Sequence, residues 1–163
     1  MTTIQEVLKP ELEKIRVELG FDNMNFYHST PNEFIQLLMN LTNTDSRLKF
    51  PLFFVNSTTV KYENGICTIG ELVIATKTDP LFRAEVRDEQ SFKPILQPIY
   101  RKFYWDLKTG IRNAVMLKEG SVKLHYFYGK SGLYGYEGTT LPDCIDAIEL
   151  NNFQIRIFNT CKL

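Results

Sequence analysis

The sequence contains few of the residues from which metal and disulfide sites are built: three cysteines and two histidines in 163 residues. The cysteines, Cys67, Cys144 and Cys161, are odd in number, and no two of them have Cys-x-x-Cys spacing. Such a set indicates neither a disulfide framework nor a zinc site, and it fits a reducing compartment. No HExxH, EF-hand or zinc-finger spacing occurs either. We therefore expect no metal and no cofactor.

The chain also lacks net charge, since 19 basic residues balance 19 acidic ones. A domain dedicated to nucleic-acid binding is usually strongly basic, so this balance argues against one. The segment 101–130 holds a local excess of lysine and arginine, which would suit an acidic partner, a phosphate backbone or solvent alone. No stretch approaches 18 apolar residues, and the first residues do not resemble a leader, so we expect no membrane span and no secretion signal.

Catalytic motifs are missing as well. Gly129-Lys130-Ser131 matches the end of a phosphate-binding loop, but that motif requires a glycine where Leu124 stands. No nucleophile motif places a serine or cysteine beside His28 or His125. The acids of Arg87-Asp88-Glu89 fall in a mixed-charge helical stretch, which is typical of a solvent-facing surface. The sequence therefore predicts no catalytic, cofactor-binding or metal-binding residue, and no enzymatic activity.

What the chain does have is clear hydrophobic periodicity, which predicts helices. Residues 4–19 carry one apolar stripe that begins after a capping Thr3 and stops at Gly20. Pro10 would either kink this helix or make it restart near Lys9. A second helix is predicted over residues 31–40, with Thr30 as its N-cap and Pro31 in its first position.

The strongest helical pattern runs over residues 92–107, after a helical stretch at 83–90. Pro94 and Pro98 interrupt its apolar face, and each removes a backbone donor. They predict a break near Lys93, with Pro94 in the first turn of a new helix.

Strands are predicted at residues 52–55, 66–76 and 122–128, and as two further runs at 144–150 and 153–158. Asn64-Gly65 predicts a tight turn before the second of them. Together these elements predict one α+β domain over residues 1–163. Its helical part covers about 1–45, and its β region, central helix and C-terminal strands cover about 50–163. Antiparallel strands backed by helices on one face would bury the apolar surfaces.

Aromatic residues make up 13% of the chain, and glycine and tyrosine gather over residues 129–138. Aromatics beside such a loop often mark a docking surface, although these tyrosines would equally fold back over a long hairpin. The residues of the predicted docking or self-association surface are Tyr126, Phe127, Tyr128, Lys130, Leu133, Tyr134 and Tyr136.

Several runs across nearly the whole chain carry a resemblance to a known group. They are Phe26-Tyr27-His28, Lys49-Phe50-Pro51-Leu52, Ile74-Ala75-Thr76-Lys77-Thr78-Asp79-Pro80, Arg87-Asp88, Phe92-Lys93-Pro94-Ile95-Leu96-Gln97-Pro98-Ile99-Tyr100 and Ala147-Ile148-Glu149-Leu150. With these runs the chain resembles small virion proteins of tailed bacteriophages, including those of Bacteroidetes and crAss-like phages. The order of its elements is similar to the tail-terminator and neck-completion fold.

This resemblance implies a structural virion protein that forms a ring of six or twelve copies at the portal–tail junction, with no catalysis. The implied partners are other copies of the chain, the portal or neighbouring ring proteins and, in passing, genomic DNA in the channel. Assembly would take place in the host cytoplasm, away from membranes. Two alternatives remain at this stage: a tail-tube or adaptor subunit, and a small binding protein or enzyme that uses the basic and aromatic surface of residues 101–136.

Overall fold

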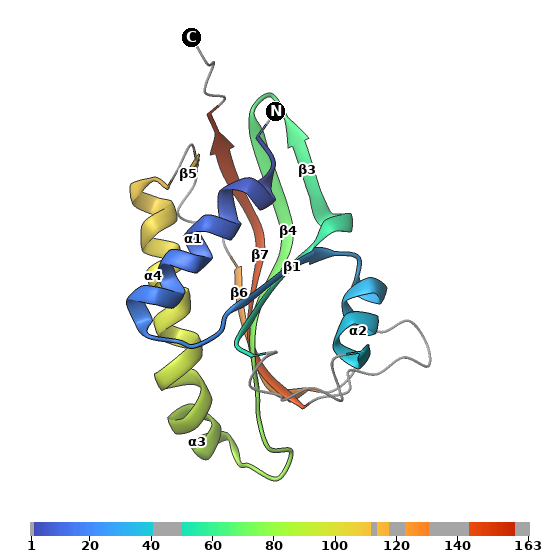
Figure 1. Ribbon diagram of the computed structural model, residues 1–163, viewed down its shortest axis with the longest axis vertical. Coiled ribbons are helices and arrows are strands. Elements are labelled where there is room, and N and C mark those ends of the chain that lie inside the picture. The colour runs from blue at the N-terminus through green and yellow to red at the C-terminus, as the bar shows by residue number, and fades with distance from the viewer. Residues whose placement is uncertain (1, 41–49, 112–113, 118–122, 131–143, 159–163) are drawn as a thin grey trace.

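The computed structural model describes residues 2–40, 50–111, 114–117, 123–130 and 144–158, and its centre is one seven-stranded sheet (Figure 1). The strands are β1 (Asn25–Ser29), β2 (Leu52–Asn56), β3 (Val60–Glu63), β4 (Ile66–Lys77), β5 (Ala114–Met116), β6 (Lys123–Lys130) and β7 (Ile145–Ile157). Their order is β1-β2-β4-β7-β5, while β3 pairs with β4 and β6 pairs with β7. Helices and this sheet together confirm the predicted α+β class.

The helical segments of the described residues are α1 (Ile4–Leu19), α2 (Pro31–Asn40), α3 (Ala84–Arg87), the π-helical segment η3 (Asp88–Leu96) and α4 (Gln97–Thr109), with a short 3₁₀ turn, η2 (Ser57–Thr59). Helices α1 and α2 begin at their predicted caps, Thr3 and Thr30. Thr3 and Glu6 form a reciprocal capping box, and Gly20 closes α1 in a left-handed conformation. Helix α1 runs through Pro10 without restarting.

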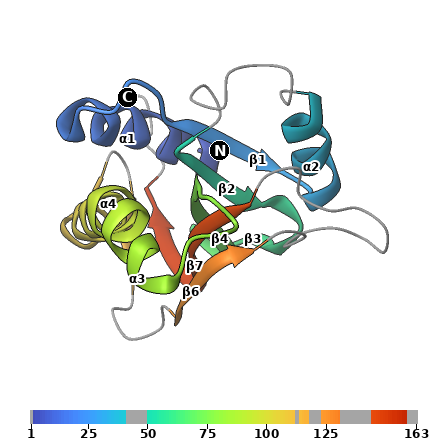
Figure 2. The same ribbon diagram turned by 90° about the horizontal axis from the view of Figure 1, so that it is seen from below.

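Helices cover both faces of the sheet, which corrects the prediction of helices on one face only. Figure 2 shows α1, α3 and α4 on one side and α2 on the other. The reason lies in the parallel pairing of β1 with β2, whereas the other described strand pairs are antiparallel. A parallel pair needs a crossover connection, and α2 supplies it between these two strands.

Two hydrophobic cores follow from this arrangement. The larger core lies between the sheet and α1, η3 and α4, and it includes Ile4, Leu8, Phe53, Phe103 and Phe153. The smaller core lies beneath α2, where Phe34 stacks on Phe54 with ring centroids 4.2 Å apart. No helix of the described residues is long and apolar enough to cross a membrane.

In the central strands β4 and β7, the alternation of side chains between the two faces of the sheet shifts by one residue at Gly70 and Asn152. In β4 the residues that face the larger core are Cys67 and Ile69 and then, one position later than strict alternation allows, Leu72 and Ile74. Gly70 and Asn152 lie between the paired residues Ile69–Phe153 and Glu71–Asn151, and the φ of Asn152 is +53°. The two runs predicted at 144–150 and 153–158 are therefore one strand, β7, and of the two residues between them Asn152 has the left-handed conformation.

The helical run after Arg83 also differs from its prediction, because no break occurs near Lys93. The chain winds on through η3, a π-helix in which the Gln97 amide donates to the Phe92 carbonyl. Pro94 lies inside this wider segment, and Pro98 falls in the first turn of α4, where a missing N–H costs little. The α-helix α4 thus begins at Gln97, after Pro94 and not with it.

Candidate functional site

The predicted docking residues that the structure describes lie on strand β6. Tyr126 and Tyr128 point to the side of the sheet that carries η3 and α4, and Phe127 points to the opposite side, against the smaller core. This alternation agrees with the predicted strand pattern. Lys130 is the last residue of β6. The remaining predicted residues, Leu133, Tyr134 and Tyr136, are outside the described residues.

Tyr126 and Tyr128 rest on a buried phenylalanine from η3. The ring centroid of Phe92 is 5.5 Å from that of Tyr126 and 4.6 Å from that of Tyr128. The Tyr128 hydroxyl donates to the Asp88 Oδ1 atom at 2.9 Å. Burial and this bond to Asp88 raise the pKa of Tyr128. Nonetheless 45% of Tyr126 and 41% of Tyr128 remain exposed, so two ordered aromatic rings face solvent.

Other exposed or half-exposed side chains extend this surface. Leu124 lies on the same side of β6 and is also exposed, and Tyr100 and Tyr104 follow on α4 with ring centroids 5.8 Å apart. Tyr126 is close enough to Tyr100 to raise the pKa of Tyr100, although burial is the larger cause. We call Tyr100, Tyr104, Leu124, Tyr126 and Tyr128 the tyrosine surface.

Strand β6 is an edge strand within the described part of the chain, because it pairs with β7 and with no other described strand. An edge strand is a place where another chain can add to a sheet. The opposite end of the sheet is β1, which pairs with β2 only. Two different sheet edges are thus present, and the β6 edge carries the tyrosine surface.

A buried ion pair fixes the far end of β6 and was not predicted from the sequence. Arg87 and Asp146 are 6% and 0% exposed, and the Arg87 Nη1 atom lies 3.1 Å from the Asp146 Oδ1 atom. The same oxygen accepts the Gly129 N–H at 2.8 Å. Arg87 also donates to the carbonyls of Asp79, Pro80 and Phe82. Arg87, the last residue of α3, is therefore a buried tie between β6, β7 and the carbonyls of residues 79–82.

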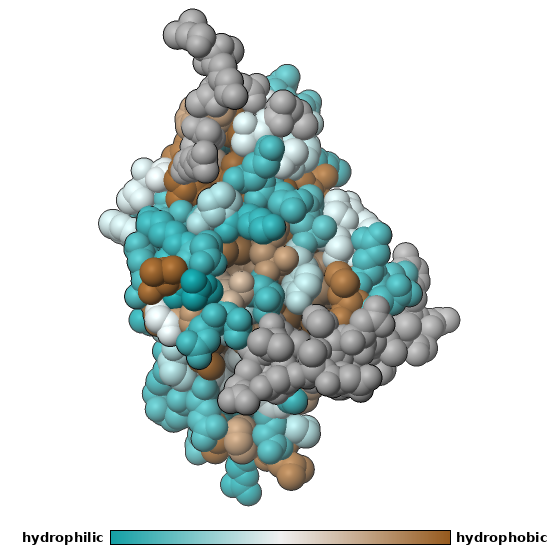
Figure 3. All heavy atoms as spheres, in the orientation of Figure 1, coloured by the Kyte–Doolittle hydropathy of each residue, from teal (hydrophilic) through white to brown (hydrophobic). Residues whose placement is uncertain are grey.

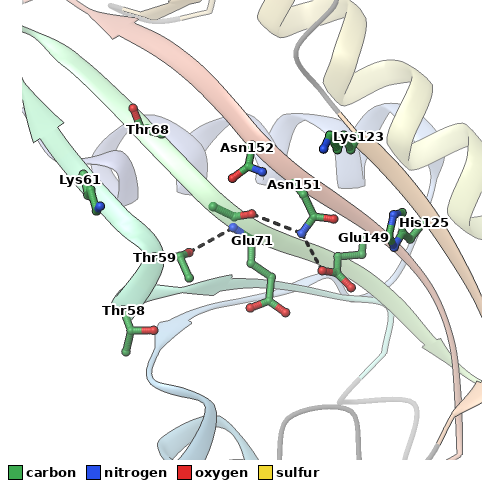
Figure 4. A pocket seen from close by; sticks show the side chains of 11 residues that line it. Thr58, Thr59, Lys61, Thr68, Glu71, Lys123, His125, Glu149, Asn151 and Asn152 are labelled. Atoms are coloured by element: carbon green, nitrogen blue, oxygen red, sulfur yellow. Dashed lines mark hydrogen bonds between the residues drawn. The ribbon is translucent and has the colours of Figure 1, made fainter.

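A polar groove crosses the opposite face of the sheet, beyond the part that α2 covers (Figure 4). It has a volume of about 780 Å³ and is lined by side chains of η2, β3, β4, β6 and β7. Glu71 and Glu149 lie on its floor, and each accepts a hydrogen bond from an asparagine amide, Asn56 at 2.8 Å and Asn151 at 2.6 Å. Lys61 on one side and Lys123 on the other form its basic rims.

The structure separates the two histidines considered as catalytic candidates. His28 is on β1 at one end of the sheet, and His125 is on β6 at the other, within the groove. Burial lowers the pKa of His28. Burial also raises the pKa of the Cys67 thiol to about 11, which makes it a poor nucleophile at neutral pH. Among the described residues, no group of three His, Cys, Asp or Glu side chains is arranged to hold a metal ion.

The basic excess of segment 101–130 does not form one face in the described residues. Lys102 lies on α4, where it pairs with Glu18 and Asp106, and Lys123 lies in the groove on the other side of the sheet. The face that carries α1 and α4 is mainly hydrophilic, with separate hydrophobic patches (Figure 3).

Comparison of the chain with family models, with curated proteins and with solved structures gives no match.

Proposed function

We propose that this chain is a non-catalytic assembly protein whose copies join side by side into a ring through the tyrosine surface and the open edge of β6. The observation that carries the proposal is the ordered pair Tyr126 and Tyr128 on an edge strand. Tyrosine supplies a large contact area at low entropic cost, and it is enriched in protein interfaces. Here Phe92 and Asp88 hold the two rings in place before any partner binds, which lowers the cost of ordering them in a contact.

The two ends of the sheet suit a ring. A ring needs a head-to-tail contact between two different surfaces, which closes when the rotation from copy to copy divides a full turn. The β6 edge and the β1 edge lie at opposite ends of the strand order. A contact from one end of a copy to the other end of the next copy satisfies this requirement.

The setting of the ring follows from the resemblance to virion proteins of tailed bacteriophages. In that setting the chain is a neck or tail-completion subunit at the portal–tail junction, in six or twelve copies, with the portal or adjacent rings as neighbours. A neutral chain suits a channel that DNA passes through without tight binding. A tail-tube or adaptor subunit would use the same edges, but a tube would continue to grow where a ring closes.

The mass of the purified protein in solution tests the proposal. Light scattering after size exclusion would give six or twelve times 19.0 kDa, about 114 or 228 kDa, and Tyr126→Ser with Tyr128→Ser would reduce it toward the single chain. Leu37→Ser is the matched control, because Leu37 is similarly exposed but lies on α2. A closed ring in electron micrographs would exclude a tube. A wild-type monomer at every concentration, with and without portal protein, would overturn the proposal.

The predicted loop contribution needs its own variant. Tyr134→Ala with Tyr136→Ala, outside the described residues, is expected to leave the fold intact and to weaken assembly. Unchanged assembly would limit the contact to β6 and α4.

The polar groove favours a second function, a small binding module. Carboxylates, amides and threonine hydroxyls gather there, and together they suit a ligand rich in hydroxyl groups, such as a sugar. A ligand that binds the folded state raises the melting temperature by mass action. A panel of mono- and oligosaccharides should then raise the melting temperature of the wild type but not that of Glu149→Gln. No shift with any of them would remove this function from consideration.

A further inference from the structure

Two acidic side chains face each other inside the contact between helices α1 and α4. Glu11 of α1 is 7% exposed and Asp106 of α4 is 6% exposed, and their carboxyl groups are within hydrogen-bonding reach of each other. Two ionised carboxylates cannot bond, because both are acceptors only. Accordingly the Glu11 Oε1 and Asp106 Oδ2 atoms are buried without a donor among the described residues. One proton held between the two groups would give each of these oxygens a partner.

The charged groups around the pair are unevenly distributed. Both nearby lysines approach Asp106: the Lys14 Nζ atom lies 3.7 Å from its Oδ2, and the Lys102 Nζ atom lies 3.6 Å from its Oδ1. Lys102 also forms an ion pair with Glu18 of α1, whose Oε2 atom lies 2.8 Å from the Lys102 Nζ atom. Asp106 is therefore the group that stays ionised, and Glu11 is the group that takes the proton.

The titration of the two acids agrees with this assignment. Burial, then the bond with Asp106 and its charge, raises the pKa of Glu11 from 4.5 to about 7, while Lys14 opposes the shift and Glu18 adds to it. Burial acts in the same direction on Asp106, but the bond with Glu11 and the charges of Lys102 and Lys14 outweigh it, so the pKa of Asp106 is lowered.

From this geometry we propose that α1 is held on α4 by a proton shared between Glu11 and Asp106, and that loss of this proton loosens α1. The inference is independent of the ring. Helix α1 covers the larger core with Ile4, Val7, Leu8, Leu12 and Ile15. Its N-terminus has separate bonds, from the capping box and from the Ile4 N–H to the Tyr62 hydroxyl at 2.9 Å. The proton acts on the middle of the helix.

The sign of the pH effect follows from the raised pKa. Between about 4.5 and about 7 the folded chain holds a proton at Glu11 that the unfolded chain has released. The stabilisation is complete below about 4.5 and is lost as the pH rises through about 7. Above that pH a second negative charge is buried beside Asp106, and the two lysines are left to compensate both.

The test is urea unfolding of the full chain from pH 5 to pH 9, for the wild type and for Glu11→Gln. Because the folded chain binds one more proton than the unfolded chain between about pH 4.5 and about pH 7, the equilibrium constant for unfolding should rise by up to about tenfold per pH unit in that range. A glutamine at this position is neutral at every pH and can donate to Asp106, so its curve should lack the wild-type fall in stability and keep only the rise with pH that the lowered pKa of His28 contributes. Glu13→Gln is the matched control on the exposed face of α1, and it should keep the wild-type slope.

A site-specific measurement keeps the proposal testable even if the glutamine variant folds poorly. Carbon-13 NMR of the wild-type carboxyl groups should show Glu11 titrating near neutral pH, and the amides of α1 should exchange faster at pH 8 than the chemical rate predicts. A Glu11 carboxyl that titrates at its ordinary pKa would overturn the proposal. Parallel pH profiles of the wild type and Glu11→Gln would also overturn it.

Discussion

The guanidinium group of Arg87 lies where a side chain on Gly129 would have to be. A Cβ atom built on Gly129 would be 1.7 Å from the Arg87 Nη1 atom. Gly129 also has a φ of +61°, and its N–H is bonded to Asp146. Only glycine fits at position 129, because the buried Arg87 guanidinium occupies the space of a side chain. The end of β6, and with it the tyrosine surface, therefore depends on Gly129.

Replacing this glycine should cost more than its backbone conformation alone explains. In a left-handed position an ordinary residue loses about 1–2 kcal/mol, and Gly20→Ala, with a φ of +73° and no atom within 4 Å, should lose that much. Gly129→Ala should lose clearly more, because it also displaces Arg87. Urea unfolding of both variants measures the difference. Equal losses would mean that Arg87 moves aside freely.

The Arg87–Asp146 pair itself should be sensitive to the removal of one partner. Asp146→Asn leaves Arg87 buried without its counter-charge, a change that costs about 3–5 kcal/mol in buried pairs. The double variant Arg87→Met with Asp146→Asn should recover part of the loss, since no charge is then left alone. The exposed pair Glu13–Arg16 is the comparison, and Glu13→Gln should show no measurable loss of stability. A small effect of Asp146→Asn would show that water reaches Arg87.

The first two helices could be predicted from the sequence because residues next to their ends determine where they begin or stop. Thr3, Gly20 and Thr30 act on the next turn of the chain, so no distant contact is needed to place α1 and α2. The Asn64-Gly65 turn is equally local, and both residues adopt the positive φ that such a hairpin turn requires.

The missed features depend on partners far apart in the chain. Strand β1 has no strong alternation of its own, and it is a strand because it pairs with β2. The tie between Arg87 and Asp146 joins residues 59 positions apart. The run 145–150 contains two acids, Asp146 and Glu149, and nothing adjacent in the sequence shows that only Asp146 is fully buried. The groove joins five elements in the same way, so local patterns showed only Lys123 and His125 as polar positions of one strand.

The one-residue shift of the alternation in the two central strands should depend on Asn152. Its φ of +53° is one that asparagine tolerates and alanine does not. Asn152→Ala should therefore lose about 1 kcal/mol or more, whereas Asn152→Gly should stay near the wild type. Asn151→Ala does not serve as a control, because it would also remove the hydrogen bonds that the Asn151 amide donates to Gly70 and Glu149. Thermal unfolding distinguishes the two substitutions at position 152, and a loss from glycine equal to that from alanine would point to the asparagine side chain.

The start of α1 should depend on one hydroxyl group of strand β3. The Ile4 N–H belongs to the first turn, where no carbonyl of the helix can accept it, and the Tyr62 oxygen accepts it at 2.9 Å. Tyr62→Phe keeps the ring but leaves the N–H of the buried Ile4 without this acceptor, so the free energy of unfolding should fall by about 1–3 kcal/mol. Tyr126→Phe is the matched control, because Tyr126 is 45% exposed against 39% for Tyr62 and its hydroxyl bonds to no described residue.

Hydrogen exchange adds a local reading of the same bond. The Ile4 amide should exchange faster in Tyr62→Phe, while amides in the middle of α1 should keep their wild-type rates, because the Glu11–Asp106 contact holds that part of the helix. Faster exchange along the whole of α1 would mean that the hydroxyl secures the helix as a unit, and that its two attachments act cooperatively. Unchanged exchange at Ile4 would mean that the capping box of Thr3 and Glu6 holds the first turn without Tyr62.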